Sequence, residues 1–439
     1  MPDNRAGRKG RGILIAAPGS GAGKTTLTLA LLRALKNRGT AAVSAKSGPD
    51  YIDPKFHEAA SGCTCINLDA WAMDGATIRA LAADRAGGSD CLIVEGAMGL
   101  FDGAANGCGS AADLAVLLGL PVVLIVDCAK QAHSVAALVH GFRTFRGDVN
   151  IGGVILNRVG SERHEKMLRA ALAPLEVPVL GAMPRAEALR LPERHLGLVQ
   201  AQEHEALEAF LEEAATMCTQ SLDLDAFAGL AGELTSPEPG LLKLPAPLGQ
   251  KIAVARDVAF AFTYPHLLEH WKNDGAELTF FSPLADEAPV PEADAVFLPG
   301  GYPELHAARL ASAPVFKSGM TAAASSGKLI YGECGGYMTL GEGLIDAEGS
   351  RHGMLGLLPL ETSFKTRKRH LGYRKVRARG GLPWVGELSA HEFHYASIVG
   401  ENGQDRLFEA EDAEGNALDA MGLQSQNVMG SFAHVIAAA

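Results

Sequence analysis

The sequence predicts an α/β protein of two domains, with a doubly wound parallel sheet in the first half of the chain. Short runs rich in Val, Ile, Leu and Ala alternate there with longer helical patterns. Runs this apolar are typical of strands buried on both faces of a parallel sheet. A proline-rich segment without periodicity interrupts the series, and a second series of strands and helices follows it. The chain therefore divides into two α/β regions.

The individual elements follow from the same pattern, taken in chain order. The expected strands of the first half are bounded by Gly, Pro or Asp and lie at residues 13–17, 41–45, 92–95, 122–126, 153–156 and 177–182. Residues 27–36 have helical periodicity and follow the first strand. The expected strands of the second half lie at residues 251–255, 277–281, 295–298 and 329–331.

Composition gives the expected boundaries of the domains. Residues 1–11 are polar and basic without an apolar core, so we expect a flexible basic tail rather than a signal peptide. Residues 12–232 form the first domain and residues 251–439 the second. The linker between them, 233–250, contains four prolines.

Bulk composition excludes several classes of protein. The chain has 439 residues and a formal net charge of -11, which argues against a nucleic-acid binder. The longest apolar run, residues 114–126, is about half a membrane span and fits a buried strand with its lead-in. Seven scattered cysteines favour a reducing compartment, and Cys63 and Cys65 lack a second ligand pair at zinc spacing. We therefore expect a soluble, cytoplasmic protein.

A glycine-rich segment, APGSGAGKTT at residues 17–26, joins the first expected strand to its helix. Its backbone N–H groups can surround phosphate oxygens, and the helix N-terminus adds its dipole. Lys24 would reach the outer phosphates and the Thr25 hydroxyl would bind Mg²⁺. Pro18 replaces the usual first glycine, and the alternative is a turn that binds no ligand. The candidate nucleotide-binding residues of the loop are Gly19, Ser20, Gly21, Ala22, Gly23, Lys24, Thr25 and Thr26.

Polar residues follow the next strands where a parallel sheet places its ligand crevice. Glu95 ends one strand and Asp102 follows it closely, so either can hold Mg²⁺ or serve as a turn acid. Asp127 is a weaker case of the same kind. Asn157 and Arg158 can line the nucleotide base, although a solvated turn is an alternative for Arg158.

The segment KSGPDYIDP, residues 46–54, is dense in polar groups and also follows a strand. It can carry a metal, substrate carboxylates or both. Asp50 is a candidate metal ligand, and Asp50 and Asp53 can equally be ordinary turn acids. Lys46 and Tyr51 complete the candidate substrate-binding residues of this segment.

A cysteine in the second half has the setting of a nucleophile. Cys334 lies between a strand and a helix beside Gly335, and small neighbours permit the sharp turn that exposes such a side chain. Gly300 and Gly301 lie just past the end of an earlier strand, and their N–H groups, with that of Gly335, can hold an oxyanion. Near the C-terminus, GSFAH offers His434 as the base that activates the thiol.

His391 and His394 in SAHEFHYA are rival bases, but we expect substrate contacts there instead. A lone cysteine is usually a buried small hydrophobe and a lone histidine is usually structural. The ordered combination of the three motifs favours the catalytic interpretation.

At these residues the sequence resembles a known family. The first half resembles the dethiobiotin-synthetase-like ATPases, and the second half resembles class I glutamine amidotransferases. Nearly the whole chain, from residue 12 to residue 434, is similar to the cobyrinic or hydrogenobyrinic acid a,c-diamide synthases. The motifs that carry the resemblance are KSGPDYIDP, VEGAMGLFDG, NRVGSERH, FFSPLAD, LPGGYPE, ECGGYM, LGYR, HEFHY and GSFAH.

The resemblance implies a ligase that amidates the a- and c-acetate side chains of a corrinoid in cobalamin biosynthesis. Glutamine would supply ammonia, and ATP with Mg²⁺ would activate each carboxylate as an acyl phosphate. Cys334 would be the glutaminase nucleophile and His434 its activator. The residues implied in the synthetase site are Asp50, Tyr51, Asp53, Glu95 and Asp102. A homodimer is one candidate assembly.

Two departures from the family pattern stand out. Ile436 lies two residues after His434, where a conventional triad has glutamate, so we expect a Cys-His dyad. The chain also reads AHEFHYA where members often have GHEFHYS, so Ala396 excludes any role for a serine there.

A basic run precedes LGYR although the chain is acidic overall. We expect it, with Tyr373 and Arg374, to attract a substrate that carries many carboxylates, and a solvated loop is the alternative. The run consists of Lys365, Arg367, Lys368, Arg369 and His370.

Other functions remain open on the sequence alone. Cobyric acid synthase and nickel-sirohydrochlorin a,c-diamide synthase are alternatives within the same class. A nucleotide-switch binding protein with an inactive amidotransferase-like module is an alternative from another class. A dethiobiotin-type carboxylase would leave the second half without a function. The sequence does not decide whether the substrate carries cobalt.

Overall fold

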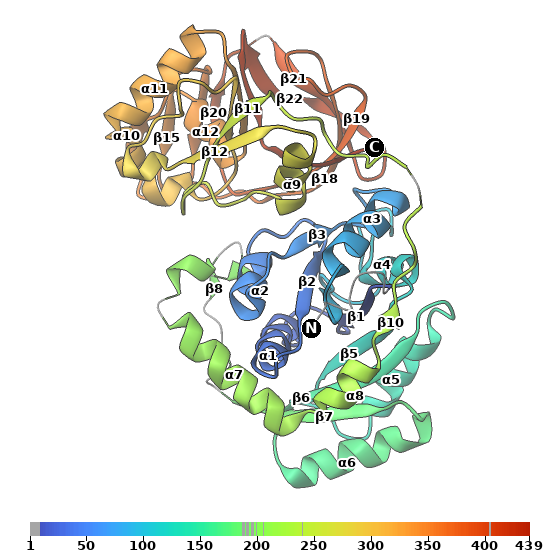
Figure 1. Ribbon diagram of the computed structural model, residues 1–439. Helices are drawn as coiled ribbons and strands as arrows, with labels where there is room; N and C mark the ends of the chain where they lie inside the picture. Colours follow the sequence, from blue (N-terminus) through green and yellow to red (C-terminus); the bar gives the residue numbers. More distant parts are fainter. Residues whose placement is uncertain are drawn as a thin grey trace. The chain divides into compact units, whose positions relative to one another are not determined.

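The chain divides into two compact units, Met1–Leu242 and Lys243–Ala439 (Figure 1). The predicted linker, 233–250, spans this division. The predicted basic tail lies outside the described residues except for its last three positions. No helix in the described part of the chain is long and apolar enough to cross a membrane. The computed structural model describes residues 9–186, 189, 193–194, 197–198, 200–204, 206–238, 240–403 and 405–439.

The first unit contains a parallel sheet in the order β3-β2-β4-β1-β5-β6-β7. The doubly wound sheet was correctly predicted, but the short strand β3 was not. The short β10 (Gly232–Glu233) joins β1 antiparallel, and β8 (Glu193–Arg194) pairs with β9 (Gly197–Leu198) in a separate ribbon. The parallel strands are β1 (Arg11–Ala16), β2 (Ala42–Ser47), β3 (Ile66–Leu68), β4 (Cys91–Glu95), β5 (Val122–Asp127), β6 (Ile151–Val159) and β7 (Val179–Pro184).

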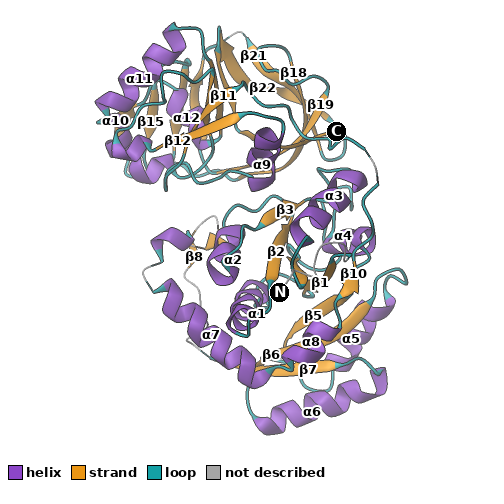
Figure 2. Ribbon diagram, viewed as in Figure 1, coloured by secondary structure: helices purple, strands orange, loops and turns teal. Residues whose placement is uncertain are grey.

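Helices connect these strands, as Figure 2 shows. Two of them start at capping side chains: Asp74 accepts the Thr77 N–H at 2.8 Å before α3, and Ser110 forms a capping box with Asp113 before α4. The apolar run 114–126 covers the end of α4 and most of β5, so its lead-in is helical. The helices are α1 (Lys24–Asn37), α2 (Asp53–Ser61), α3 (Gly75–Ala86), α4 (Ala111–Leu118), α5 (Val135–Thr144), α6 (Glu162–Leu172), η1 (Ala173–Leu175), η3 (Ala201–Glu203), α7 (Leu207–Ser221) and α8 (Leu224–Gly229).

The second unit is built on a larger mixed sheet in the order β12-β11-β13-β14-β23-β22-β21-β18-β19-β24. The run from β12 to β23 is parallel and the rest is antiparallel. The strands of this sheet are β11 (Lys251–Ala255), β12 (Glu277–Phe281), β13 (Ala295–Leu298), β14 (Leu329–Glu333), β18 (His370–Ala378), β19 (Glu387–His394), β21 (Arg406–Asp412), β22 (Ala417–Ser425), β23 (Val428–Ser431) and β24 (Ala433–Ala438).

A smaller sheet and several short helices complete the second unit. The small sheet has the order β16-β15-β17-β20, with strands β15 (Gly343–Ile345), β16 (Arg351–Gly353), β17 (Leu360–Ser363) and β20 (Ser397–Glu401). The helices are α9 (Pro265–Asn273), η4 (Pro283–Ala285), η5 (Pro303–His306), α10 (Ala307–Ala311), α11 (Pro314–Ser325) and α12 (Gly335–Leu340).

The large sheet curls strongly. Five strands (β23, β22, β21, β18 and β19) separate β14 from β24 in the sheet order. Yet the Glu333 carboxylate at the end of β14 accepts the Val435 N–H of β24 at 3.0 Å. A flat sheet would hold strands six positions apart at more than about 20 Å, since neighbours are about 4.8 Å apart. The curl therefore brings the end of β14 against β24.

Alternate residues of the central strands fill two cores on opposite faces of this sheet. On β11, Ala253 and Ala255 enter one core, whereas Ile252 and Val254 enter the other. Both cores exclude solvent, so β14 is covered on its two sides. The residue that follows it, Cys334, is only 3% exposed.

Candidate active sites

The glycine-rich loop connects β1 to α1 and turns on two glycines in the left-handed region. Gly21 has φ 78° and Gly23 has φ 89°, values that glycine adopts without strain. A side chain at Gly23 would collide with the amide of Asn157. Asn157 Nδ2 donates to the Ala22 carbonyl at 2.8 Å. The structure thus places Asn157 beneath the loop, where it supports the loop backbone.

Lys24 begins α1 and folds back over the loop. Its Nζ donates to the Gly19 carbonyl at 3.3 Å and also to the Met98 carbonyl. Only 8% of the residue is exposed. Burial, followed by the charge of Lys46, lowers the pKa of the Lys24 ammonium. The lysine therefore lies at the loop, where phosphate oxygens would offset the cost of its burial.

A compact cluster of charged groups lies beside Thr25. The Thr25 hydroxyl is 2.7 Å from Glu95 Oε1 and 3.2 Å from Asp53 Oδ2. Lys46 Nζ contacts the same two carboxylate oxygens, at 2.8 and 2.6 Å. Strands β2 and β4 and helices α1 and α2 each supply one member. One hydroxyl and two carboxylates form an all-oxygen donor set, which is the chemistry that Mg²⁺ prefers.

Glu95 is held from its other side by a residue whose role the sequence did not predict. His57 on α2 places Nε2 2.6 Å from Glu95 Oε2, and both side chains are fully buried. Cys65 Sγ lies 3.5 Å from His57 Nδ1. Burial alone would lower the pKa of His57, but Cys65 and Glu95 outweigh it and raise that pKa to about 10. Burial opposes ionisation of Glu95 too, yet Lys46 and His57 lower its pKa.

The other acidic candidates of the first unit have different surroundings. Asp50 Oδ1 accepts the N–H groups of Ile52 and Asp53, at 2.8 and 3.0 Å, and so starts α2. Burial and the neighbouring Asp53 charge raise the pKa of Asp50 to about 6. Tyr51 is half-buried in the same turn. Asp102 is exposed, and it accepts the N–H of Gly99 at 2.9 Å.

Arg158 and Asp127 lie side by side at the ends of β6 and β5. Arg158 Nη1 is 2.6 Å from Asp127 Oδ2, and both side chains are partly exposed. Arg158 has φ 57°, and its N–H donates to Asn157 Oδ1 at 2.9 Å. The two residues form an ion pair at the edge of the sheet that also carries the loop.

Cys334 lies on a strained turn between β14 and α12. Its φ of 45° and ψ of -100° are uncommon for a side chain with a Cβ. Its N–H donates to the Ser431 carbonyl at 2.8 Å. A side chain at Gly336 would collide with the Leu298 backbone, so only glycine fits there. Burial, followed by the charge of Glu304, raises the pKa of the Cys334 thiol.

The predicted oxyanion glycines gather around this cysteine. A Cβ at Gly335 would lie 2.9 Å from the Gly301 nitrogen, and a Cβ at Gly300 would strike the His434 ring. Gly300, Gly301, Gly335 and His434 are therefore all near the Cys334 turn. Three segments far apart in the sequence meet here because β13, β14 and β23 are neighbouring parallel strands and each segment follows the end of one of them.

His434 is the second residue of β24 and is 2% exposed. Its Nδ1 lies 3.7 Å from Glu333 Oε2. Burial, and next the neighbouring His391 and His394, lower the pKa of His434 to about 3. The imidazole is therefore neutral at physiological pH, which is the form that a general base requires.

Two domain families match the chain. Residues 13–199 match the CobQ/CobB/MinD/ParA nucleotide binding domain, and residues 251–439 match the CobB/CobQ-like glutamine amidotransferase domain. A hydrogenobyrinate a,c-diamide synthase from Brucella ovis is 61% identical over 97% of this chain and 98% of that one. The chain belongs to the hydrogenobyrinate a,c-diamide synthase family.

Further members of the family match at similar coverage. The proteins of the same name from Rhizobium meliloti and Mesorhizobium japonicum are 58% and 51% identical, over 97% and 98% of this chain and 99% of each of theirs. The solved structure of PurLQS from Thermotoga maritima covers 42% of this chain and 86% of its own at 17% identity, with a TM-score of 0.31. The curated relatives thus confirm the family resemblance that the motifs predicted.

In this family member, β19 carries a hydrogen-bonded network beside His434. His391 lies opposite His434 in the β19–β24 register. His394 Nε2 is 2.9 Å from Glu392 Oε1, and Arg374 Nη2 is 2.7 Å from Glu392 Oε2. Tyr373 contacts His391 edge-on, with ring centroids 5.3 Å apart. The structure therefore brings Tyr373, Arg374, His391 and His394 together.

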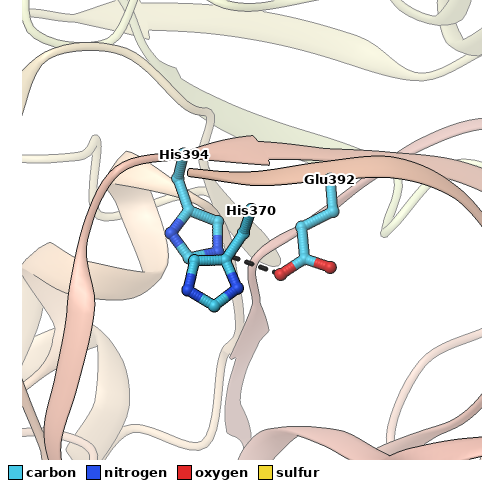
Figure 3. Close-up of side chains that lie close together, drawn as sticks. All are labelled: His370, Glu392 and His394. Carbon is cyan, nitrogen blue, oxygen red and sulfur yellow. Dashed lines mark hydrogen bonds and ion pairs between the residues drawn. The ribbon is translucent and has the colours of Figure 1, made fainter. Parts of the chain in front are cut away.

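One group in this network resembles a metal centre at first sight. His370, Glu392 and His394 place ligand atoms within 4.8 Å of one another (Figure 3). The two imidazole rings, however, are stacked 4.6 Å apart at an interplanar angle of 4°. Imidazole nitrogens bind metals in the ring plane, so parallel stacked rings do not point at one ion. The Arg374 cation on Glu392 further disfavours a metal.

The predicted basic run is exposed. Residues 365–369 are all exposed and His370 is half-buried at the start of β18. Within it, the Lys368 N–H donates to the Tyr395 carbonyl at 3.3 Å. The protein thus exposes a group of cationic side chains to solvent just before β18, the strand that carries Arg374.

Proposed function

We propose that this protein is a glutamine-dependent ligase that converts the a- and c-acetate carboxylates of hydrogenobyrinic acid to amides at the expense of ATP. One observation carries the proposal. A single chain holds both a phosphate loop with the Thr25, Asp53 and Glu95 oxygens beside it and a strained Cys334 beside a buried His434. Relatives 51–61% identical over nearly the whole chain are named for this reaction.

The first unit would activate the substrate. A carboxylate does not condense with ammonia, because its oxygen is a poor leaving group. A carboxylate oxygen would therefore attack the γ-phosphorus of ATP, and the bond to the bridging oxygen would break to release ADP. The loop N–H groups and Lys24 would hold the phosphates, so this step depends on positioning and charge stabilisation.

Mg²⁺ would be held by Thr25, Asp53 and Glu95, whose oxygens already converge, and it would neutralise phosphate charge. Asp50, the other candidate ligand from the sequence, would act by fixing the turn that precedes Asp53. Lys46 would pair with a substrate carboxylate or the developing acyl phosphate. Tyr51 and Asp102 would complete the substrate surface.

The second unit would release ammonia from glutamine. His434 would accept the Cys334 proton as the sulfur attacks the amide carbon, and the N–H groups of Gly300, Gly301 and Gly335 would hold the oxyanion. His434 would then give the proton to the departing ammonia, and water would hydrolyse the thioester to glutamate. Ammonia would attack the acyl phosphate carbon, and phosphate would leave.

Substrate recognition and domain roles complete the proposal. The exposed basic run, with Arg374 behind it, would attract a macrocycle that bears many carboxylates. We assign the synthetase to residues 12–232 and the glutaminase to residues 251–439, joined by 233–250. The cytoplasm suits the reaction, because all seven cysteines are free thiols.

The test is to incubate the protein with ATP, Mg²⁺, glutamine and hydrogenobyrinic acid and to identify products by mass and charge. We expect a diamide that has lost two negative charges, with glutamate, ADP and phosphate as co-products. Cobyrinic acid, the cobalt-containing counterpart, should react more slowly, since the relatives are named for the cobalt-free compound. ATP-dependent binding without amide formation would instead support a nucleotide switch.

A further inference from the structure

Glu333 is a buried acid directly before Cys334, at the end of β14. It is 4% exposed, and the glutaminase steps above give it no part. Burying a carboxyl group is costly unless its oxygens are paired. The contacts of this side chain therefore indicate what its burial achieves.

Each Glu333 oxygen faces a different part of its surroundings. Oε1 accepts the N–H of Val435 at 3.0 Å and the hydroxyl of Tyr331 at 3.2 Å. Oε2 lies 3.7 Å from Nδ1 of His434. The carboxyl group thus fixes the backbone of β24 next to His434 and also faces the His434 ring.

In a conventional triad, the acid that orients the histidine lies two residues after it, and here that position holds an apolar residue. Ile436, two residues after His434, is fully buried, and its carbonyl accepts a hydrogen bond from His266 Nε2 at 3.0 Å. An acid cannot approach the ring from there. Glu333 approaches it from β14, the strand that carries the nucleophile.

We infer that Glu333 is the positioning residue of the glutaminase site, which holds the His434 ring with Nδ1 toward itself and leaves Nε2 to take the Cys334 proton. An acid in this relation to a histidine fixes its tautomer and stabilises the imidazolium that forms during reaction. The separation of 3.7 Å exceeds a hydrogen bond, and such contacts tighten when substrate binds. The inference rests on the proposed glutaminase function.

The protonation state of the Glu333–His434 pair should make glutaminase activity depend on pH. Burial raises the pKa of Glu333 to about 8. Because Oε1 accepts two hydrogen bonds, a proton on this acid would reside on Oε2, the oxygen that faces His434. The pair must lose it before His434 can act as a base, and the two groups titrate together. The titratable groups that face the pair are Tyr331 on β14, Cys334 on the turn after it, and His391, Glu392 and His394 on β19.

The decisive variant is Glu333→Gln, whose amide oxygen can still accept the Val435 N–H. Glutamate release from glutamine is measured across about pH 6–10, a range of about four units around the Glu333 pKa. We expect kcat to fall about 100-fold with KM for glutamine changed less than about 2-fold. The rise in kcat that we expect near pH 8 in the wild-type protein should disappear. Glu333→Asp should restore part of the kcat and part of its rise with pH.

Two controls separate positioning from folding and from the wider proposal. Amidation with ammonium salt in place of glutamine should keep wild-type rates in Glu333→Gln. Glu387→Gln, which removes a carboxylate of β19 paired with Arg377 at 3.1 Å, should leave kcat unchanged.

Wild-type kcat and an unchanged pH profile in Glu333→Gln would overturn the inference. An equal loss of ammonium-dependent activity in Glu333→Gln and Glu333→Asp would also overturn it, in favour of a purely structural role. If the wild-type protein releases no glutamate from glutamine, the proposed function itself fails.

Discussion

The two candidate sites hold their buried groups in opposite states of charge. In the synthetase site, close partners outweigh burial: they raise the pKa of Lys46 and lower that of Glu95, so both are ionised. In the glutaminase site, burial prevails: it lowers the pKa of His434 to about 3 and raises that of Cys334, so both are neutral. The two sites thus differ in charge although both are buried.

This difference follows the substrates that each site would meet. ATP and a polycarboxylate are charged, so an arrangement of fixed charges serves them from the start. The glutamine side chain is a neutral amide, and charge develops only when the thiol loses its proton. On the proposed function, the glutaminase would therefore depend on a proton transfer, and the synthetase would depend on keeping an ion cluster intact.

Breaking the ion cluster should have the largest effect. Glu95→Gln removes the charge that Thr25, Lys46 and His57 share. We expect amidation to fall about 1000-fold with glutamine or ammonium as donor, because positioned charges of this kind contribute that much to catalysis. Product formation under saturating ATP measures it.

The matched control for that variant is Glu58→Gln on the same helix as His57, where Glu58 pairs with Lys55 at 2.9 Å. It should amidate at the wild-type rate. Near wild-type amidation by Glu95→Gln would show that the cluster is only structural.

Reversing charge in the basic run should have a smaller effect, limited to binding. In Lys368→Glu/Arg369→Glu we expect KM for hydrogenobyrinic acid to rise about 10-fold and kcat to stay constant, since long-range attraction acts on encounter. Added salt should reduce the difference. Lys251→Glu, an exposed residue at the start of β11, serves as control. An unchanged KM would show that the basic run is a solvated loop that does not attract the substrate.

The smallest expected effect is on the free energy of unfolding, and it comes from a buried neutral histidine of the second unit. His266 is 1% exposed, and burial lowers its pKa to about 4. The pKa of His266 in the folded protein is below its unfolded value of about 6.5. The neutral side chain therefore stabilises the folded state fully above about pH 6.5, and this stabilisation is lost as the pH falls toward 4.

Between about pH 6.5 and 5, the wild-type protein should therefore lose about 2 kcal/mol more unfolding free energy than His266→Gln. Chemical denaturation at the two pH values measures it. Equal losses in the two proteins would mean that His266 is protonated in the folded state.

The sequence predicted much of this fold because the local signals were strong. Strands β11, β12 and β13 have the predicted bounds, and the loop before α1 follows β1 as expected. The three-residue strand β3 was missed because its signal is too short. No strand after Cys334 was predicted, because the pairing of those strands depends on the curl of the sheet, which is a long-range property.

The sequence motifs identified the residues of the two candidate sites, but they did not show which other side chains contact those residues. Asp50 and Asp53 have equivalent sequence signals, and only the structure shows that Asp53 reaches Thr25. His57 is one histidine in a helix, and no local pattern links it to Glu95. Glu333 did carry a signal, because it is an acid at the end of an apolar strand, directly before the candidate nucleophile Cys334. Its relation to His434 required the pairing of β14 with β23, which places Glu333 opposite Ser431, three residues before His434.

The most direct test of two separate sites in one chain is Cys334→Ala supplied with glutamine and, separately, with ammonium salt. We predict that glutamine-dependent amidation falls at least about 10⁴-fold, as expected for loss of a nucleophile. Amidation with ammonium should remain at the wild-type level, because the ion cluster at Thr25 and Glu95 is untouched. Loss of both activities, with the protein still folded, would contradict the division of the reaction between two sites.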